Sequence, residues 1–343
     1  MCAIPPFFVI EKCILLNKRL KIFLNYFLGP ILFIWLLFSI RHQVLQQKDL
    51  HQTWKAMVQS LTGPDWWKVL TVLVLMFVNW GIETRKWQLL IYDVERISFL
   101  KAFRAVFSGQ AFAINTVNNV GEYVGRVMYL HEGNRLRAVS LTIVGSMAQI
   151  ITTFAIGLIG LLFMKNTILG SSGNFKGFSV FWIDGMMWLL LLITIVLLLF
   201  YYSLSWVTKI VERLPFMSRF VYLIEKLEQL HWKELTRILI LSVIRYVVFV
   251  VQYLLLLQVF KVEADAWSVC WMVCVMFLIL AIVPSIALAE LGLRGEVSIQ
   301  LLGLLSGNTL GIVFSATGIW MINRVMPAVA GSLFILGVRL FKK

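Results

Sequence analysis

Long apolar runs recur along the chain and are separated by short polar segments. We predict membrane-spanning helices at 22–40, 69–91, 138–164, 180–204, 238–260, 267–289 and 308–338. Most of these runs reach the about 20 residues that an α-helix needs to cross a bilayer. The pattern therefore predicts an all-α, polytopic helical bundle of about seven or eight spans, forming a single transmembrane domain over residues 1–343.

Composition supports a membrane protein and argues against a soluble one. Of the 343 residues, 60% are hydrophobic and only 14% are charged, whereas a soluble domain has about 25% charged residues. The net charge of +14 indicates basic loops against anionic lipid headgroups, and we expect no nucleic-acid partner. Lysines and arginines before the first run and after the last predict cytoplasmic termini in the cell (inner) membrane.

Residues 102–130 are apolar enough to enter a membrane but are interrupted by small, amide and charged residues. Non-helical backbone at membrane depth is tolerated only inside protein or beside water. We therefore predict a re-entrant or broken helical hairpin that enters from the cytoplasmic side and returns to it.

A second break lies at Pro284–Glu296, PSIALAELGLRGE, after seventeen apolar or small residues. Two arrangements fit this pattern. In one, 267–289 crosses the membrane, 290–300 forms a cytoplasmic turn and two short spans follow. In the other, 276–305 is a second re-entrant or broken hairpin that enters from outside, followed by one long, broken span.

The two breaks resemble each other in chemistry. Residues 118–126 read NNVGEYVGR and residues 290–296 read ELGLRGE, so each contains an acid, an arginine and two glycines. Paired broken segments in the two halves of a chain indicate a transporter site near the midplane. The predicted substrate-binding residues are Asn118, Asn119, Glu122, Arg126, Glu290, Arg294 and Glu296.

Each residue type suggests a role. Arg126 and Arg294 carry the planar guanidinium that suits phosphate, the glutamates would position these arginines or an amine, and the asparagines would add neutral hydrogen bonds. The alternative is structural, because each Glu–Arg pair has the i,i+4 spacing of a helical ion pair. We interpret Arg245 and Arg324 as packing or snorkelling residues.

Segment 205–237 has an amphipathic pattern and six basic residues. It predicts a cytoplasmic helix that either rests on anionic lipid or simply connects two spans. No catalytic motif, metal-ligand spacing or cofactor fingerprint is present in the sequence. We therefore expect no cofactor and no metal, and the sequence leans against an enzyme without excluding one.

The segments NNVGEYVGRVMYL (118–130) and PSIALAELGLRGE (284–296), with the small-residue span between them, resemble the lysylphosphatidylglycerol synthase transmembrane-region family. The resemblance covers about 20–335. In better-known members this membrane part is implicated in moving aminoacylated phospholipids between leaflets, and a soluble domain performs aminoacyl transfer. That domain has no counterpart here, so the resemblance does not imply synthase activity.

One motif departs from the family pattern. Many members carry Gly-Gly-x-Gly-x-Arg-Glu in the second half, but here Ala289 and Glu290 stand where the glycine pair would be, and Gly295 separates Arg294 from Glu296. The resemblance therefore does not fix the substrate. The sequence predicts a flippase-like transporter of a phospholipid or other amphipathic lipid. The alternatives are a membrane-embedded enzyme of lipid or glycan metabolism and a non-catalytic membrane subunit.

Overall fold

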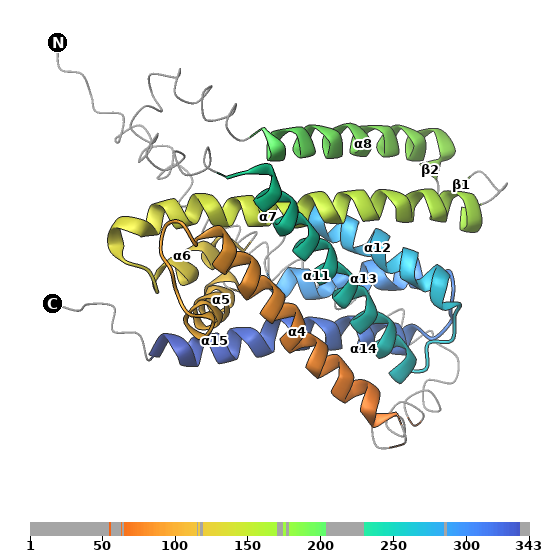
Figure 1. The fold of residues 1–343 in the computed structure, drawn as a ribbon. Helices are drawn as coiled ribbons and strands as arrows, with labels where there is room; N and C mark the ends of the chain where they lie inside the picture. Colours follow the sequence, from red (N-terminus) through yellow and green to blue (C-terminus); the bar gives the residue numbers. More distant parts are fainter. Residues whose placement is uncertain are drawn as a thin grey trace, which may run out of the picture.

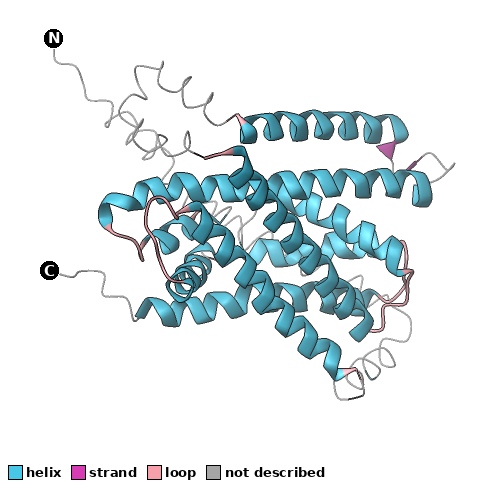
Figure 2. Ribbon diagram, viewed as in Figure 1, coloured by secondary structure: helices cyan, strands magenta, loops and turns pink. Residues whose placement is uncertain are grey.

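A computed structural model describes residues 65–114, 119–169, 178–203, 230–284 and 287–336, together with 174–175 and a few isolated positions. The described chain is helical except for one antiparallel pair of two-residue strands, β1 (Asn174–Phe175) and β2 (Phe178–Ser179). Figures 1 and 2 show a bundle of long helices with shorter ones packed at both ends. The predicted all-α bundle is confirmed.

Four long helices form at predicted spans, and their bounds are α4 (Trp66–Leu90), α7 (Glu132–Phe163), α8 (Val180–Tyr202) and α11 (Trp232–Val259). A short π-helical segment, η3 (Met164–Leu169), extends α7. Counting the C-terminal helix, five helices of the described ranges are long and apolar enough to cross a membrane. The predicted span at 22–40 and most of the 205–237 segment, up to residue 229, lie outside the described residues.

The C-terminal helix is continuous but irregular. It runs through α14 (Thr309–Trp320), a π-helical turn η6 (Met321–Val325) and α15 (Met326–Leu336). This single broken helix agrees with the second predicted arrangement. The first arrangement is wrong at 290–300, because α13 (Ala287–Leu302) is helical there. Polar residues at i,i+4 spacing pair within that helix, so the charges do not force a turn.

The first polar break forms a helical hairpin. Its arms are α5 (Phe99–Ala113) and α6 (Gly121–Val127), and its tip includes Ile114 and Asn119. Glu95 joins the two open ends, because its carboxylate accepts hydrogen bonds from the backbone N–H of His131 at 3.0 Å and the side chain of Asn134 at 3.2 Å. The chain therefore leaves and returns at the same end of the bundle.

The second break forms a hairpin at the opposite end. Its arms are α12 (Ala266–Ile282) and α13, and its tip includes Val283 and Pro284. Asn308, which follows α13, donates from Nδ2 to the carbonyls of Phe260 at 3.0 Å and Lys261 at 2.9 Å, just before α12 begins. Lys261 also pairs with Asp65 at the start of α4. Figure 1 shows α5–α6 and α12–α13 in different parts of the bundle.

Close backbone contacts hold the first hairpin. A Cβ on Gly125 would lie 2.6 Å from the Cα of Gly109, so α5 and α6 touch without a side chain between them. A Cβ on Gly331 would lie 1.9 Å from the carbonyl oxygen of Phe107, so α15 crosses α5 equally closely. Small residues allow helices to approach in this way. The first hairpin and α15 therefore pack as one unit.

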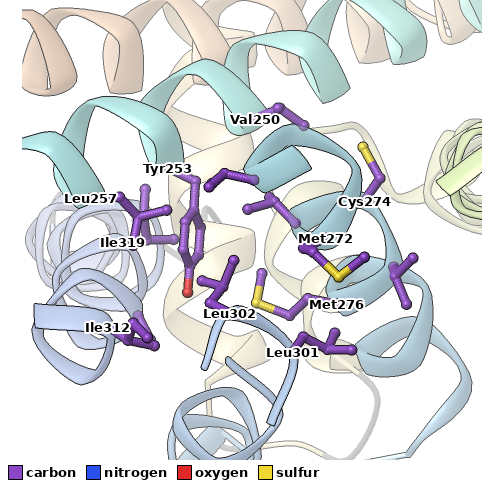
Figure 3. Packing of buried hydrophobic residues seen from close by; sticks show 14 of the residues in the cluster. Val250, Tyr253, Leu257, Met272, Cys274, Met276, Leu301, Leu302, Ile312 and Ile319 are labelled. Carbon is purple, nitrogen blue, oxygen red and sulfur yellow. The ribbon is translucent and has the colours of Figure 1, made fainter. Parts of the chain in front are cut away.

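Two apolar clusters fill the described bundle. One includes Trp87, Phe107 and Leu141 and surrounds the first hairpin, and the other includes Tyr253, Met276 and Ile312 and surrounds the second. Figure 3 shows Tyr253 of α11 beside Leu302 and Ile319 in the second cluster. Its hydroxyl lies 2.8 Å from Ser298 Oγ of α13. Each hairpin thus has its own core.

Candidate functional site

A cavity of about 300 Å³ lies where the two hairpins meet α4, α7, α11 and the C-terminal helix. Asn119 at the first tip, and Ala281 and Glu290 on either side of the second, contribute to its wall. Its polar lining residues are Gln110, Asn119, Glu122, Gln149, Thr153, Arg245, Glu290, Arg294, Asn323 and Arg324. We call this the central cavity. It joins the two polar motifs that the sequence paired.

One side of the central cavity rests on a cluster around Glu83, made of Glu83, Lys86, Arg126 and Arg245. Glu83 Oε1 accepts from Arg126 at 2.8 Å, and its Oε2 lies 2.7 Å from Lys86 Nζ and 2.9 Å from Arg245 Nη1. The Glu83 and Lys86 side chains are almost completely buried. A buried carboxylate needs such pairing, because an isolated charge inside the bundle is very costly.

Arg126 links the Glu83 cluster to the first hairpin. Its guanidinium also pairs with Glu122, one turn earlier on α6, and the centre of that guanidinium lies 6.0 Å from the ring of Trp87. Arg126 is 2% exposed and lies behind Glu122, which lines the central cavity. The structure therefore places Glu122 at the cavity and Arg126 in its wall.

Arg245 of α11 reaches from the Glu83 cluster to the cavity. Besides Glu83, it donates to Asn79 Oδ1 at 2.8 Å, and its guanidinium lies 5.2 Å from the ring of Trp80 and 5.4 Å from that of Phe249. Stacking against aromatic faces and a carboxylate partner fix the planar group in one orientation. Arg245 is thus a rigid cation in the cavity wall.

The other side of the cavity holds the Glu290 cluster, made of Glu290, Arg294 and Arg324. Glu290 Oε1 accepts from Arg294 at 2.9 Å and Oε2 accepts from Arg324 at 3.1 Å. Arg324 also donates to Gln110 of α5 at 3.2 Å. It lies in the π-helical turn η6, and such turns often occur at functional sites. One carboxylate here serves two guanidiniums.

Several buried polar atoms beside this cavity have no hydrogen-bond partner in the protein. Among the described residues they include Trp80 Nε1, Arg294 Nε, Trp320 Nε1 and Asn323 Oδ1, all on residues that line the cavity. Three of these four atoms are donors. Buried polar groups in native proteins are nearly always satisfied, so three unpaired donors on residues of one cavity wall are unusual.

The predicted site residues have different outcomes. Asn119, Glu122, Glu290 and Arg294 line the central cavity, and Asn119 adopts the left-handed backbone conformation with φ of 58°. Asn118 lies outside the described residues. Glu296 accepts from Gln300 at 2.7 Å on its own helix and is absent from the described cavity lining. The two i,i+4 ion pairs predicted from the sequence both form.

Sequence reasoning missed part of the site. Glu83 and Lys86 were not among the predicted site residues, yet both are buried beside the cavity. Arg245 and Arg324, interpreted as packing or snorkelling residues, line it. A signal was present, because Asn79, Glu83 and Lys86 recur at helical spacing and so share one face of α4. That stripe predicts a polar helix–helix contact rather than a loop.

Comparison with known proteins identifies the family. No curated protein matches the chain. The family model described as the lysylphosphatidylglycerol synthase TM region matches residues 22–331, which is nearly the whole chain. The matched range contains both hairpins and every residue of the central cavity named above. The chain belongs to the lysylphosphatidylglycerol synthase transmembrane-region family.

Proposed function

We propose that the central cavity binds the phosphate-bearing headgroup of a phospholipid and that the protein moves this lipid between leaflets. The observation that carries the proposal is the shared cavity: one space is lined by both hairpins, by three arginines and by residues with unpaired buried donors. A family whose model is a membrane part of a phospholipid-modifying protein supports a lipid ligand.

Charge in and behind the cavity wall favours an anion. The ion-pair network of the described residues contains five cations and three carboxylates, namely Lys86, Arg126, Arg245, Arg294 and Arg324 against Glu83, Glu122 and Glu290. An uncompensated positive site away from bulk water attracts a negative group. A guanidinium offers parallel N–H donors that match phosphate oxygens.

The size of the cavity also suits a headgroup. Its volume of about 300 Å³ is at the lower end of the range for small-ligand sites. Two acyl chains would not fit in it and would remain against the apolar surfaces of the helices. We therefore assign the phosphate to Arg294, Arg324 and Arg245, with Glu122 and Asn119 facing the rest of the headgroup.

The hairpins suggest how the headgroup crosses. Arms of 15 residues in α5 and 16 residues in α13 are shorter than the about 20 residues of a full span. We propose that both hairpins are re-entrant and enter from opposite sides, with α5–α6 on the cytoplasmic side, where Arg96 and Arg104 gather. Alternating access between opposed broken helices is a known transporter arrangement.

The test reconstitutes purified protein into vesicles with a fluorescent phospholipid and follows its movement between leaflets by chemical quenching. We expect Arg294→Gln/Arg324→Gln to slow lipid movement at least about tenfold, because two charge-assisted hydrogen bonds to phosphate are lost. The matched control is Arg104→Gln, an exposed arginine that lines no described cavity. It should move lipid as the unmodified protein does.

Other outcomes separate the alternatives. Unmodified protein that moves no lipid would reject the proposal. A new lipid mass in the vesicles would favour the enzyme. If Arg294→Lys and Arg324→Lys, which keep the charge, also prevent accumulation of folded protein, the cluster only holds the fold together and a non-catalytic subunit is favoured.

A further inference from the structure

A second cavity of about 440 Å³ lies at the end of the interface between α4 and α11. The two helices run antiparallel: Gln252 of α11 donates to the carbonyl of Val72 at 2.9 Å, and Lys86 Nζ lies 3.5 Å from Ser242 Oγ. The second cavity comes after Lys86, where Leu90 ends α4 and α11 begins. We call it the lateral cavity.

The polar rim of the lateral cavity carries three arginines. Arg85 donates to Gln88 at 2.7 Å, the Arg96 guanidinium lies 4.7 Å from the ring of Tyr92, and Arg237 projects from the first turns of α11. Among the described residues, no carboxylate forms an ion pair with any of the three. This rim differs from the central cavity, where Arg245, Arg294 and Arg324 are all paired.

The rest of the lateral cavity combines an apolar wall with Gln88 and two carboxylates, Asp93 and Glu234. Leu89, Leu90, Leu230, Leu235 and Ile238 form its wall. Tyr92 lines the cavity and is 49% exposed, and Trp232 in the first turn of α11 is 65% exposed. Exposed aromatic residues are typical of a membrane–water interface. Three arginines against two carboxylates leave the rim a net charge of +1. Such a rim beside an aliphatic wall matches an anionic amphiphile better than a small inorganic anion.

We propose that the lateral cavity is a second lipid site, which holds the headgroup of an anionic phospholipid with its chains against the leucine wall. Along α4, Trp80 of the central cavity and Leu89 of the lateral cavity are separated by roughly 14 Å at about 1.5 Å per residue. Glu83 and Lys86 lie between them along that helix. Headgroups in the two cavities would therefore be separated by a buried ion pair.

The test counts bound lipid by native mass spectrometry, using short-chain phosphatidylglycerol. It compares Arg85→Gln/Arg237→Gln with Lys233→Gln/Arg104→Gln, which removes the same charge from exposed residues outside the lateral cavity. Both pairs are placed in the Arg294→Gln/Arg324→Gln background, so that lipid bound through the Glu290 cluster does not obscure the result. We expect the first pair to weaken binding about tenfold and the second to change it less than twofold.

Specificity arms complete the experiment. Short-chain phosphatidylcholine should bind more weakly than phosphatidylglycerol, and millimolar inorganic phosphate should not displace the lipid. Equal weakening by the two variant pairs, equal binding of phosphatidylcholine, or displacement by phosphate would each overturn the proposal. Because this readout is binding rather than movement, protein that binds lipid here but transports none would reject the proposed function and leave this inference standing.

Discussion

The Glu83 cluster and the Glu290 cluster both pair one glutamate with basic residues, but they differ in burial. Glu83 is held by three cations from α4, α6 and α11, with only 6% of its side chain exposed. Glu290 is held by two arginines, and Arg324 keeps 25% of its side chain exposed. Of the first cluster only Arg245 lines the central cavity, whereas all three members of the second cluster line it.

The difference separates charges that are buried in the bundle from charges that line a cavity. A buried carboxylate that is paired with several cations stabilises the fold, because without it those cations would be buried without a counter-charge. A carboxylate shared by two guanidiniums at a cavity wall positions them for a third group. Intramembrane charge alone therefore does not identify a site, and whether the charged group lines a cavity must be considered too.

The largest expected effect is that of Glu83→Gln. It leaves Lys86, Arg126 and Arg245 without their shared carboxylate, and breaking such a buried pair costs about 3–5 kcal/mol. We expect little folded protein after detergent extraction and a strongly lowered melting temperature. Glu132→Gln, on a side chain that is 88% exposed, is the control. Normal melting of Glu83→Gln would remove the distinction between the two clusters.

Glu290→Gln should destabilise the fold less than Glu83→Gln does, and it should strengthen lipid binding. The loss of two partly exposed ion pairs should cost about 1–2 kcal/mol. Arg294 and Arg324 then carry uncompensated charge, so short-chain phosphatidylglycerol should bind several-fold more tightly, as measured by titration calorimetry. Weaker binding would mean that Glu290 matters mainly as the group that orients the arginines.

The smallest effect is expected at Glu95, which joins the open ends of the first hairpin outside the spans. Partial burial raises the pKa of its carboxyl, but hydrogen bonds from the backbone of His131 and the side chains of Asn134, His131 and Lys101 outweigh it and bring that pKa to about 2. The ionised form is therefore favoured by the fold. This stabilisation is complete above the ordinary glutamate value of about 4.3 and is lost as pH falls towards 2.

The corresponding measurement compares thermal melting of Glu95→Gln with that of the unmodified protein. At pH 7 the variant should be less stable by about 1 kcal/mol, and the difference should shrink between pH 4.3 and pH 2. A difference that stays constant over this range would mean that the charge of Glu95 does not stabilise the hairpin.

Much of the fold was predictable because the bilayer imposes a strong pattern. The apolar runs that form α4, α7, α8 and α11 are long enough to be recognised as membrane spans from the sequence. The choice at Pro284–Glu296 was not predictable, since apolar residues and Glu–Arg pairs fit a helix arm as well as a helix end. The structure resolves it through α13, which is helical over 290–300, and hydrogen bonds from Asn308 to Phe260 and Lys261 then join the open ends of this hairpin.

The two Glu–Arg motifs of the candidate site were predictable, but the ion-pair partners that other helices supply were not. Glu122–Arg126 and Glu290–Arg294 follow from i,i+4 spacing. The ion pairs of Glu83 with Arg245, 162 positions away, and of Glu290 with Arg324 depend on which helices cross. Hydrophobicity patterns carry no information about which helices cross. The sequence alone therefore does not distinguish an arginine that packs between helices from one that lines a cavity.

The π-helical turn η6 (Met321–Val325) determines which face α15 presents relative to α14. Before it, Ile319 and Trp320 face the central cavity, and after it Gly331 fits against the backbone of Phe107. Deleting one residue from this turn would rotate everything beyond it by about 100°. Gly331 would then leave α5, and Arg324 would leave Glu290 and Gln110. The π-helical turn contains one residue more than an α-helical turn would. That residue lets one helix contact α13 through Arg324 and α5 through Gly331.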